Sequence, residues 1–149
     1  MIEKVNWTYK GRTITCVDDM PINSMGFVYE ITTENGKKYI GQKTLFNRRK
    51  RKFGKRESAK VTDKRKKLYE IIHKEGDWKT YTGSNKELNK DIENGKKYTK
   101  KILFYAFHKK QLGYLETREL FTRNVLEDDS NYYNSNISGK FYHKDTKPL

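Results

Sequence analysis

The clearest pattern in the chain is a pair of short β-forming runs joined by a turn. From Gly26 to Gly41 the sequence is GFVYEITTENGKKYIG, and apolar or aromatic side chains recur at every second position of the first run. Asn35-Gly36 lies between the runs, and this dipeptide in such a setting is the strongest local signal for a β-hairpin. The segment is therefore predicted to be an antiparallel hairpin.

The length of the turn decides which side chains share a face, because a shift of one residue moves a whole set to the other side. A two-residue turn would place Tyr29 and Tyr39 on opposite faces. A three-residue loop with Gly36 in the left-handed conformation would pair Tyr29 with Gly41. We expect the second register, in which both tyrosines and Lys43 border a recess left by the glycine.

The remaining pattern predicts a second hairpin, four helices and a buried strand. The hairpin is expected over residues 5–15, the helices over 44–52, 63–76, 84–95 and 111–127, and the strand over 98–107, beside the first hairpin. In the last helix the expected buried residues are Leu112, Tyr114, Leu115, Phe121, Val125 and Leu126. This order indicates an α+β fold with a small antiparallel sheet of about three core strands, flanked by helices. Residues 1–23 are expected to form an N-terminal extension on a domain of residues 24–149.

Composition points to the kind of partner. The chain has 149 residues, of which 34% are hydrophobic and 13% aromatic, and its formal net charge is +14. Such an excess of positive charge favours a polyanion, and the aromatic content indicates a folded domain rather than a basic tail. No apolar run suits a membrane helix, so we expect no membrane partner. The oligomeric state is left open.

Cysteine and histidine usage narrows the candidate chemistry. Cys16 is the only cysteine and the three histidines lie far apart, which excludes an internal disulfide and the usual zinc sites. We therefore expect a cytoplasmic setting and a hard metal held by oxygen ligands.

A dense run of positive charge follows the first hairpin. Residues 48–67 read RRKRKFGKRESAKVTDKRKK, which would repel itself unless it faced an anion. Its outer members suit a solvated loop, but for the stretch as a whole phosphate contact is the better interpretation. The candidate nucleic-acid-binding residues are Arg48, Lys50, Arg51, Lys52, Lys55, Arg56, Trp78 and Tyr81, although Trp78 suits a core position better.

Five short motifs follow one another along the chain: FVY at 27–29, YIG at 39–41, an arginine eight residues later, Leu115-Glu116, and Tyr133-Asn134. In this order they resemble the motifs of GIY-YIG nucleases, in particular the phage-type, homing endonuclease-like members. DWKTYTGS at 77–84 also resembles a middle segment of phage-type members. Gly26-Phe27 departs from the usual Gly-Ile. Phe53 stands where the family often has histidine or tyrosine, a role that Tyr81 would take here if it is filled at all.

The resemblance implies a metal-dependent hydrolysis of phosphodiester bonds. Glu116 would bind one divalent ion, Mg²⁺ or Mn²⁺, with Glu119 as the alternative ligand. Arg49, on the helix expected over 44–52, would grip the scissile phosphate. Asn134 would orient groups around the metal or cap local backbone.

Either Tyr29 or Tyr39 would act on the attacking water. The pKa of a free phenol is about 10, so a nearby cation is needed near neutral pH, and Lys43 is the candidate beside the metal. One of the two tyrosines would then have only a packing role.

The resemblance therefore implies a divalent-metal-dependent endonuclease of double-stranded DNA, homing or restriction-like, encoded by a phage or bacterium. The alternative is a nucleic-acid-binding protein with the same fold and an inactive site. A third interpretation, an RNA-directed domain, stays open.

Overall fold

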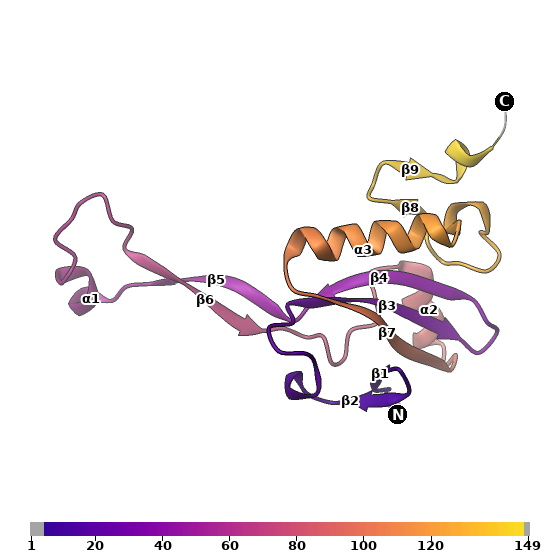
Figure 1. The fold of residues 1–149 in the computed structure, drawn as a ribbon, viewed down its shortest axis with the longest axis horizontal. Coiled ribbons are helices and arrows are strands. Elements are labelled where there is room, and N and C mark those ends of the chain that lie inside the picture. Colours follow the sequence, from indigo (N-terminus) through magenta and orange to yellow (C-terminus); the bar gives the residue numbers. More distant parts are fainter. Residues whose placement is uncertain (1–4, 148–149) are drawn as a thin grey trace. The chain divides into compact units, whose positions relative to one another are not determined.

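The computed structural model describes residues 5–147, and two compact units are distinguished within it. The first unit combines residues up to 45 with those from 77 onward, and the second contains residues 46–76. Each is described by itself. The chain order is β1 (Trp7–Tyr9), β2 (Arg12–Ile14), η1 (Val17–Asp19), β3 (Gly26–Thr33), β4 (Lys38–Thr44), β5 (Phe46–Lys52), α1 (Lys55–Ala59), β6 (Tyr69–Glu75), α2 (Lys86–Glu93), β7 (Tyr98–Ala106), α3 (Lys109–Thr122), η2 (Val125–Glu127), β8 (Asn136–Ile137), β9 (Phe141–Tyr142) and η3 (His143–Thr146) (Figure 1).

A five-stranded sheet in the order β2-β1-β7-β3-β4 is the framework of the first unit. Its strands pair antiparallel except β1 and β7, which run parallel. The α+β class agrees with the prediction, but the sheet is mixed and larger than the three-stranded antiparallel one expected. The extra strands come from residues 7–14, where Lys10 and Gly11 both have positive φ and form the predicted turn.

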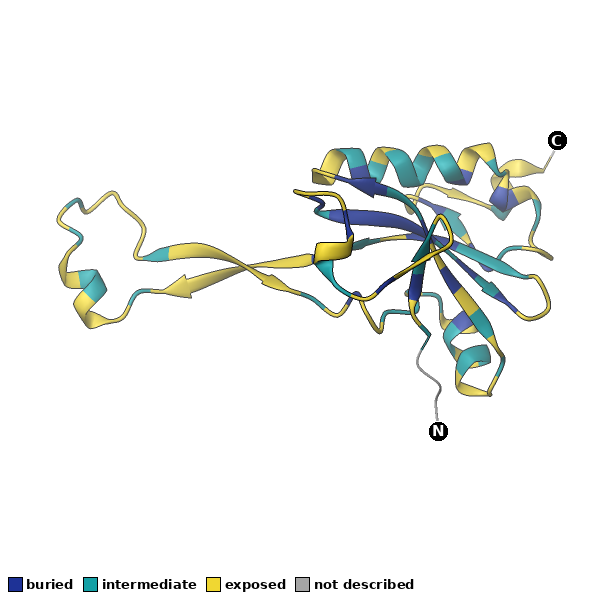
Figure 2. Ribbon diagram, turned by 60° about the horizontal axis from the view of Figure 1, so that its bottom comes forward, coloured by how far each residue is buried: buried dark blue, intermediate teal, exposed yellow. Residues whose placement is uncertain are grey.

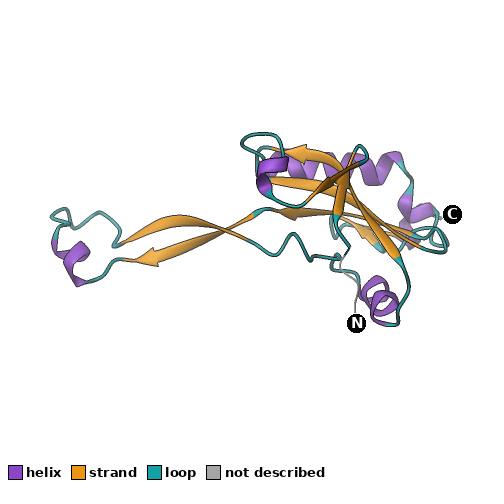
Figure 3. Ribbon diagram, turned by 90° about the horizontal axis from the view of Figure 1, so that it is seen from below, coloured by secondary structure: helices purple, strands orange, loops and turns teal. Residues whose placement is uncertain are grey.

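Helices cover both faces of this sheet (Figures 1 and 3). On one face Phe27, Tyr29 and Ile31 pack with Trp7, Trp78 and Leu88, the last of these from α2. On the other face Val28 and Ile40 pack with Leu112 and Leu120 of α3. Because β3 is covered on both sides, its first four residues are all buried.

The predicted strand over 98–107 and the last two helices are confirmed with shifted ends. β7 is the middle strand and pairs with β3, as expected. α2 begins after Asn85, whose side chain accepts a hydrogen bond from the Leu88 N–H at 2.9 Å, so the cap lies one residue beyond the predicted Ser84. In α3 the expected burial of Tyr114 and Phe121 is wrong, because they are 65% and 49% exposed.

The two helices predicted over 44–52 and 63–76 are wrong. Phe46–Lys52 and Tyr69–Glu75 are instead the strands β5 and β6 of an antiparallel two-stranded ribbon, which forms the second unit with α1. A helix over RRKRK would stack like charges three and four residues apart, whereas a strand alternates them between two faces. Across the ribbon Arg51 also pairs with Glu70, which favours the extended form.

Candidate active site

The hairpin of β3 and β4 has the predicted register. Tyr29 pairs with Gly41 and Ile31 with Tyr39. Gly36 has a φ of 85° and its N–H donates to the Thr33 carbonyl at 2.8 Å, as expected of the three-residue loop. Tyr29 and Tyr39 therefore share one face, with ring centroids 6.2 Å apart.

The recess expected over Gly41 is filled by Tyr29 itself. A Cβ atom at Gly41 would lie 2.6 Å from Cζ of Tyr29 and 3.1 Å from Cε1 of Tyr39. Gly83, whose φ is +86°, approaches the same rings from the loop before α2, since a Cβ there would lie 3.0 Å from Cε1 of Tyr39. Because Gly41 and Gly83 have no side chains, the rings of Tyr29 and Tyr39 can pack closely against the backbone of β4 and of the loop before α2.

A third phenol and a lysine complete this cluster. The Tyr81 ring lies 6.0 Å from that of Tyr29, and Lys43 Nζ lies 4.2 Å from the centre of the Tyr81 ring. Lys43 also pairs with Asp77 at 2.6 Å, and a hydrogen bond from Lys43 lowers the pKa of that carboxyl.

Lys43 does not lower the pKa of either predicted catalytic phenol. Burial is the main reason that the pKa of Tyr29 is raised well above its usual value, and burial also raises the pKa of Tyr39. The negative charge of Glu116 acts in the same direction on both. The two hydroxyls therefore keep their protons near neutral pH in the free protein.

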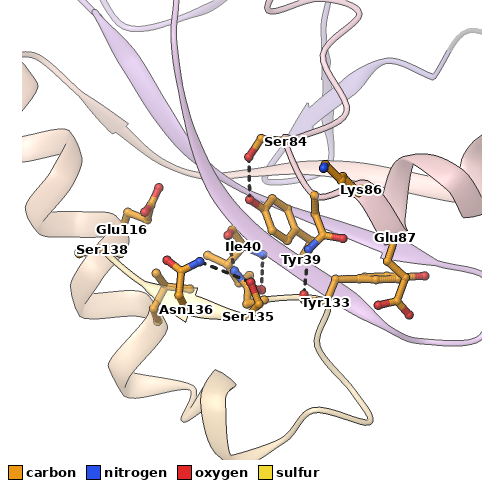
Figure 4. A pocket seen from close by; sticks show the side chains of 13 residues that line it. Tyr39, Ile40, Ser84, Lys86, Glu87, Glu116, Tyr133, Ser135, Asn136 and Ser138 are labelled. Carbon is orange, nitrogen blue, oxygen red and sulfur yellow. Dashed lines mark hydrogen bonds between the residues drawn. The ribbon is translucent and has the colours of Figure 1, made fainter. Parts of the chain in front are cut away.

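A cavity of about 510 Å³ lies beside Tyr39 at the edge of β4. Its lining comes from β4, the start of α2, α3 and the segment after η2: Tyr39, Ile40, Ser84, Asn85, Lys86, Glu87, Glu116, Leu120, Tyr133, Asn134, Ser135, Asn136 and Ser138 (Figure 4). The hydroxyls of Tyr39 and Ser84 are 3.3 Å apart and form a hydrogen bond. Ser84 was not predicted as a site residue, although it closes the DWKTYTGS segment.

Glu116 and Glu119 have different surroundings, although both belong to α3. Burial raises the pKa of Glu116 to about 7, and no hydrogen bond or ion pair joins it to another described residue. Glu119 instead accepts a hydrogen bond from Arg123 at 2.6 Å, and Arg123 also pairs with Glu30 at 2.6 Å. Glu119 is thus part of an ionic link between α3 and β3, whereas Glu116 lines the cavity.

Asn134 is buried and pairs with the open edge of β4. Its Oδ1 accepts from the Ile40 N–H at 3.1 Å, and its Nδ2 donates to the Ile40 carbonyl at 2.8 Å. Both ends of the amide are therefore engaged with the backbone next to Tyr39, which matches the backbone-capping alternative.

The other predicted residues divide between the two units. Arg49 is exposed on β5 and faces Ile72 across the ribbon, so the helical context that supported its choice is absent. The basic candidates Arg48, Lys50, Arg51, Lys52, Lys55 and Arg56 are also in the second unit and are exposed. Trp78 is fully buried and accepts a hydrogen bond from Trp7 Nε1 at its carbonyl, so its prediction as a nucleic-acid contact is wrong.

A family model described as "Putative endonuclease segE, GIY-YIG domain" matches residues 7–137. The chain belongs to the GIY-YIG nuclease family. The match begins at β1 and includes the paired tyrosines, the basic segment and Glu116. Searches among curated proteins and among solved structures found no significant match. The GIY-YIG domain is that of an endonuclease family, so nuclease activity is assigned at the level of the family.

The cavity of this GIY-YIG domain suits one hard cation. Among the described residues no cluster of three or more His, Cys, Asp or Glu side chains occurs, so a site built from several protein carboxylates is not available. A single half-buried carboxylate with no cationic partner, beside hydroxyl oxygens, suits an ion such as Mg²⁺, which retains most of its waters. No helix among residues 5–147 could cross a membrane.

Proposed function

We propose that this protein is a divalent-metal-dependent endonuclease that hydrolyses phosphodiester bonds in double-stranded DNA. The supporting observation is Glu116: its carboxylate is half-buried, has no cationic partner among the described residues, and lines the same cavity as Tyr39. The pKa of this half-buried carboxyl is about 7, and a bound cation would lower it, so that the carboxyl would release its proton on metal binding.

Glu116 is the proposed ligand for Mg²⁺ or Mn²⁺. The bound ion would supply positive charge to the phosphate in the transition state and to the departing oxygen. Asn134 keeps the β4 backbone in place next to Tyr39, so in this proposal it is a positioning residue.

Tyr39 is the phenol proposed to contact the attacking water. It lines the cavity, whereas Tyr29 is only 1% exposed and is not among the lining residues. In the free protein Tyr39 is protonated and can orient the water by hydrogen bonding, since burial raises its pKa. Loss of its proton becomes favourable only where a positive charge lies nearby.

Lys43 and Arg49 are the two candidates for the side chain that contacts the scissile phosphate. Lys43 is supplied by the first unit, next to the tyrosine cluster, and its side chain is 17% exposed. The family resemblance implies that Arg49 contacts the scissile phosphate, and this role stays a prediction. Comparison of Lys43→Ala with Arg49→Ala in single-turnover cleavage separates the two, since only the true contact should slow the chemical step.

Cleavage of supercoiled plasmid by the purified protein tests the proposal. Nicked or linear DNA is expected with Mg²⁺ or Mn²⁺ and none with excess EDTA. If the protein retards DNA but leaves it intact with either metal on several substrates, the inactive DNA-binding alternative is correct. Competition with structured RNA tests the RNA-directed interpretation, which predicts stronger competition by RNA than by duplex DNA.

A further inference from the structure

The β5–β6 ribbon has two faces of different charge. Directly opposed residues in an antiparallel pair share a face, and successive residues alternate. One face, here called the basic face, has Arg48, Lys50 and Lys52 on β5 and Tyr69, Ile71 and His73 on β6. The other, called the paired face, has Asn47, Arg49 and Arg51 on β5 and Glu70, Ile72 and Lys74 on β6.

On the paired face one of the three cations, Arg51, has two acidic partners. Arg51 forms an ion pair with Glu70 across the ribbon and another with Glu57 of α1 at 2.6 Å. On the basic face the only acid is Glu75, which is opposite Phe46 at the end of the ribbon. With Glu57 counted, the paired face has three cations and two acids, whereas the basic face has three cations and one acid, so the basic face has the larger excess of positive charge.

Two lysines lie over the ring of Tyr69, at the Lys52 end of the basic face. Lys50 Nζ lies 4.6 Å from the centre of its ring, and Lys67 Nζ lies 5.5 Å from it. Hydrogen bonding to Lys67, and then the charges of both lysines, lower the pKa of the Tyr69 hydroxyl.

Neither strand of the ribbon has a covering layer. Every residue of β5 is exposed, as are the six residues of β6 after Tyr69 (Figure 2). An isolated two-stranded hairpin is only marginally stable in water, and uncompensated like charges destabilise it further. A polyanion lying along the basic face would remove that repulsion.

We propose that the ribbon inserts its basic face into the major groove of duplex DNA. The major groove of B-DNA is about 12 Å wide and admits a two-stranded ribbon, whereas the deep, narrow major groove of an A-form RNA duplex does not. Arg48, Lys50 and Lys52, which all belong to β5, would contact phosphates and base edges of the DNA. This inference rests on the proposed function for its partner, but it concerns affinity rather than cleavage.

Matched charge reversals on the two faces test the proposal. Lys50→Glu changes the basic face and Lys74→Glu the paired face; both residues are exposed lysines at interior positions of a strand. Binding is measured in the Glu116→Gln background, so that cleavage does not interfere. We expect Lys50→Glu to weaken binding to duplex DNA about tenfold or more and Lys74→Glu to change it less than threefold. We also expect Lys50→Ala to reduce the slope of log K against log salt by about one.

Chemical probing locates the contact in the groove. Guanine N7 lies in the major groove, so bound protein is expected to protect it from methylation, and Lys50→Glu should remove the protection. Equal effects of the two reversals, unprotected N7 atoms, or equal binding to an RNA duplex of the same sequence would overturn the proposal. None of these results bears on metal-dependent cleavage, which is measured separately with the unmodified site.

Discussion

At the scale of single residues, close approach and burial set the chemistry of the site. Because Gly41 has no side chain, the ring of Tyr29 can lie against the backbone of β4. Glu116 lines the cavity and has no neutralising partner among the described residues. Tyr39 lines the same cavity as Glu116, and burial raises the pKa of its hydroxyl.

Gly41→Ala is expected to destabilise the protein by about 1–3 kcal/mol, because the new methyl group would overlap the Tyr29 ring. Gly113→Ala is the control, since a Cβ atom there meets nothing within 4 Å and alanine is the better helix former. Chemical denaturation measures both. A Gly41→Ala protein as stable as the control would show that the close packing of Tyr29 on Gly41 is wrong.

The raised pKa of the Glu116 carboxyl should make the stability of the protein depend on pH. Its pKa of about 7 in the folded protein lies above its usual 4.5, so the folded protein binds the proton more tightly. The stabilisation from this proton is complete below pH 4.5 and is lost as pH rises through 7. Glu116→Gln is therefore expected to be more stable than the unmodified protein at pH 8, with the difference shrinking toward pH 4 in thermal melts. A constant difference across that range would contradict this assignment.

At the scale of elements, local strand pairing could be predicted from the sequence, whereas pairing between distant segments could not. Asn35-Gly36 and the alternation around it were enough for the hairpin and its register, because turn length fixes pairing locally. The ribbon was missed because RRKRK has no apolar period, and its pairing with 69–75 is not local. The contribution of β1 to the sheet was missed for a similar reason, since its parallel partner β7 is about ninety residues away.

Motif order alone selected two residues, Tyr39 and Glu116, that the structure brings to one cavity. Tyr29, Tyr39 and Glu116 were chosen as candidates from the order of motifs along the chain, and the structure adds that Glu119, the alternative ligand, accepts a hydrogen bond from Arg123. Ser84 reaches Tyr39 through the path of a loop, which no short-range pattern specifies.

The ionic link between α3 and β3 gives a prediction at this scale. Arg123→Ala would leave Glu30 and Glu119, whose side chains are 12% and 15% exposed, without their shared cation. We expect a loss of about 2–4 kcal/mol in the free energy of unfolding. Arg118→Ala removes an exposed arginine of the same helix and should cost under 1 kcal/mol. Similar losses for the two variants would argue against the link.

At the scale of the whole molecule, the proposed chemistry and the proposed DNA affinity belong to different units. Residues of the first unit line the cavity, while the second unit carries a dense set of cations on a ribbon without a core. Phe46 and Glu75 are paired at the ends of the ribbon, so a short linker can replace it.

Replacement of residues 46–76 by a short Gly-Ser linker is expected to leave the first unit folded. Removal of so many cations should weaken DNA binding by at least about a hundredfold and flatten its salt dependence. Circular dichroism and fluorescence anisotropy measure folding and binding. An unfolded product would contradict the independence of the first unit, and unchanged affinity would contradict the role of the second.

Metal-dependent cleavage through Glu116 is the central claim, and single-turnover plasmid cleavage in Mg²⁺ tests it most directly. Glu116→Gln is compared with Glu87→Gln, which changes another acid of the same cavity, one that pairs with Lys37 at 3.0 Å. With DNA binding intact, Glu116→Gln should slow cleavage roughly 10²–10³-fold, and Glu87→Gln less than about threefold. Cleavage by Glu116→Gln at the unmodified rate would contradict the claim.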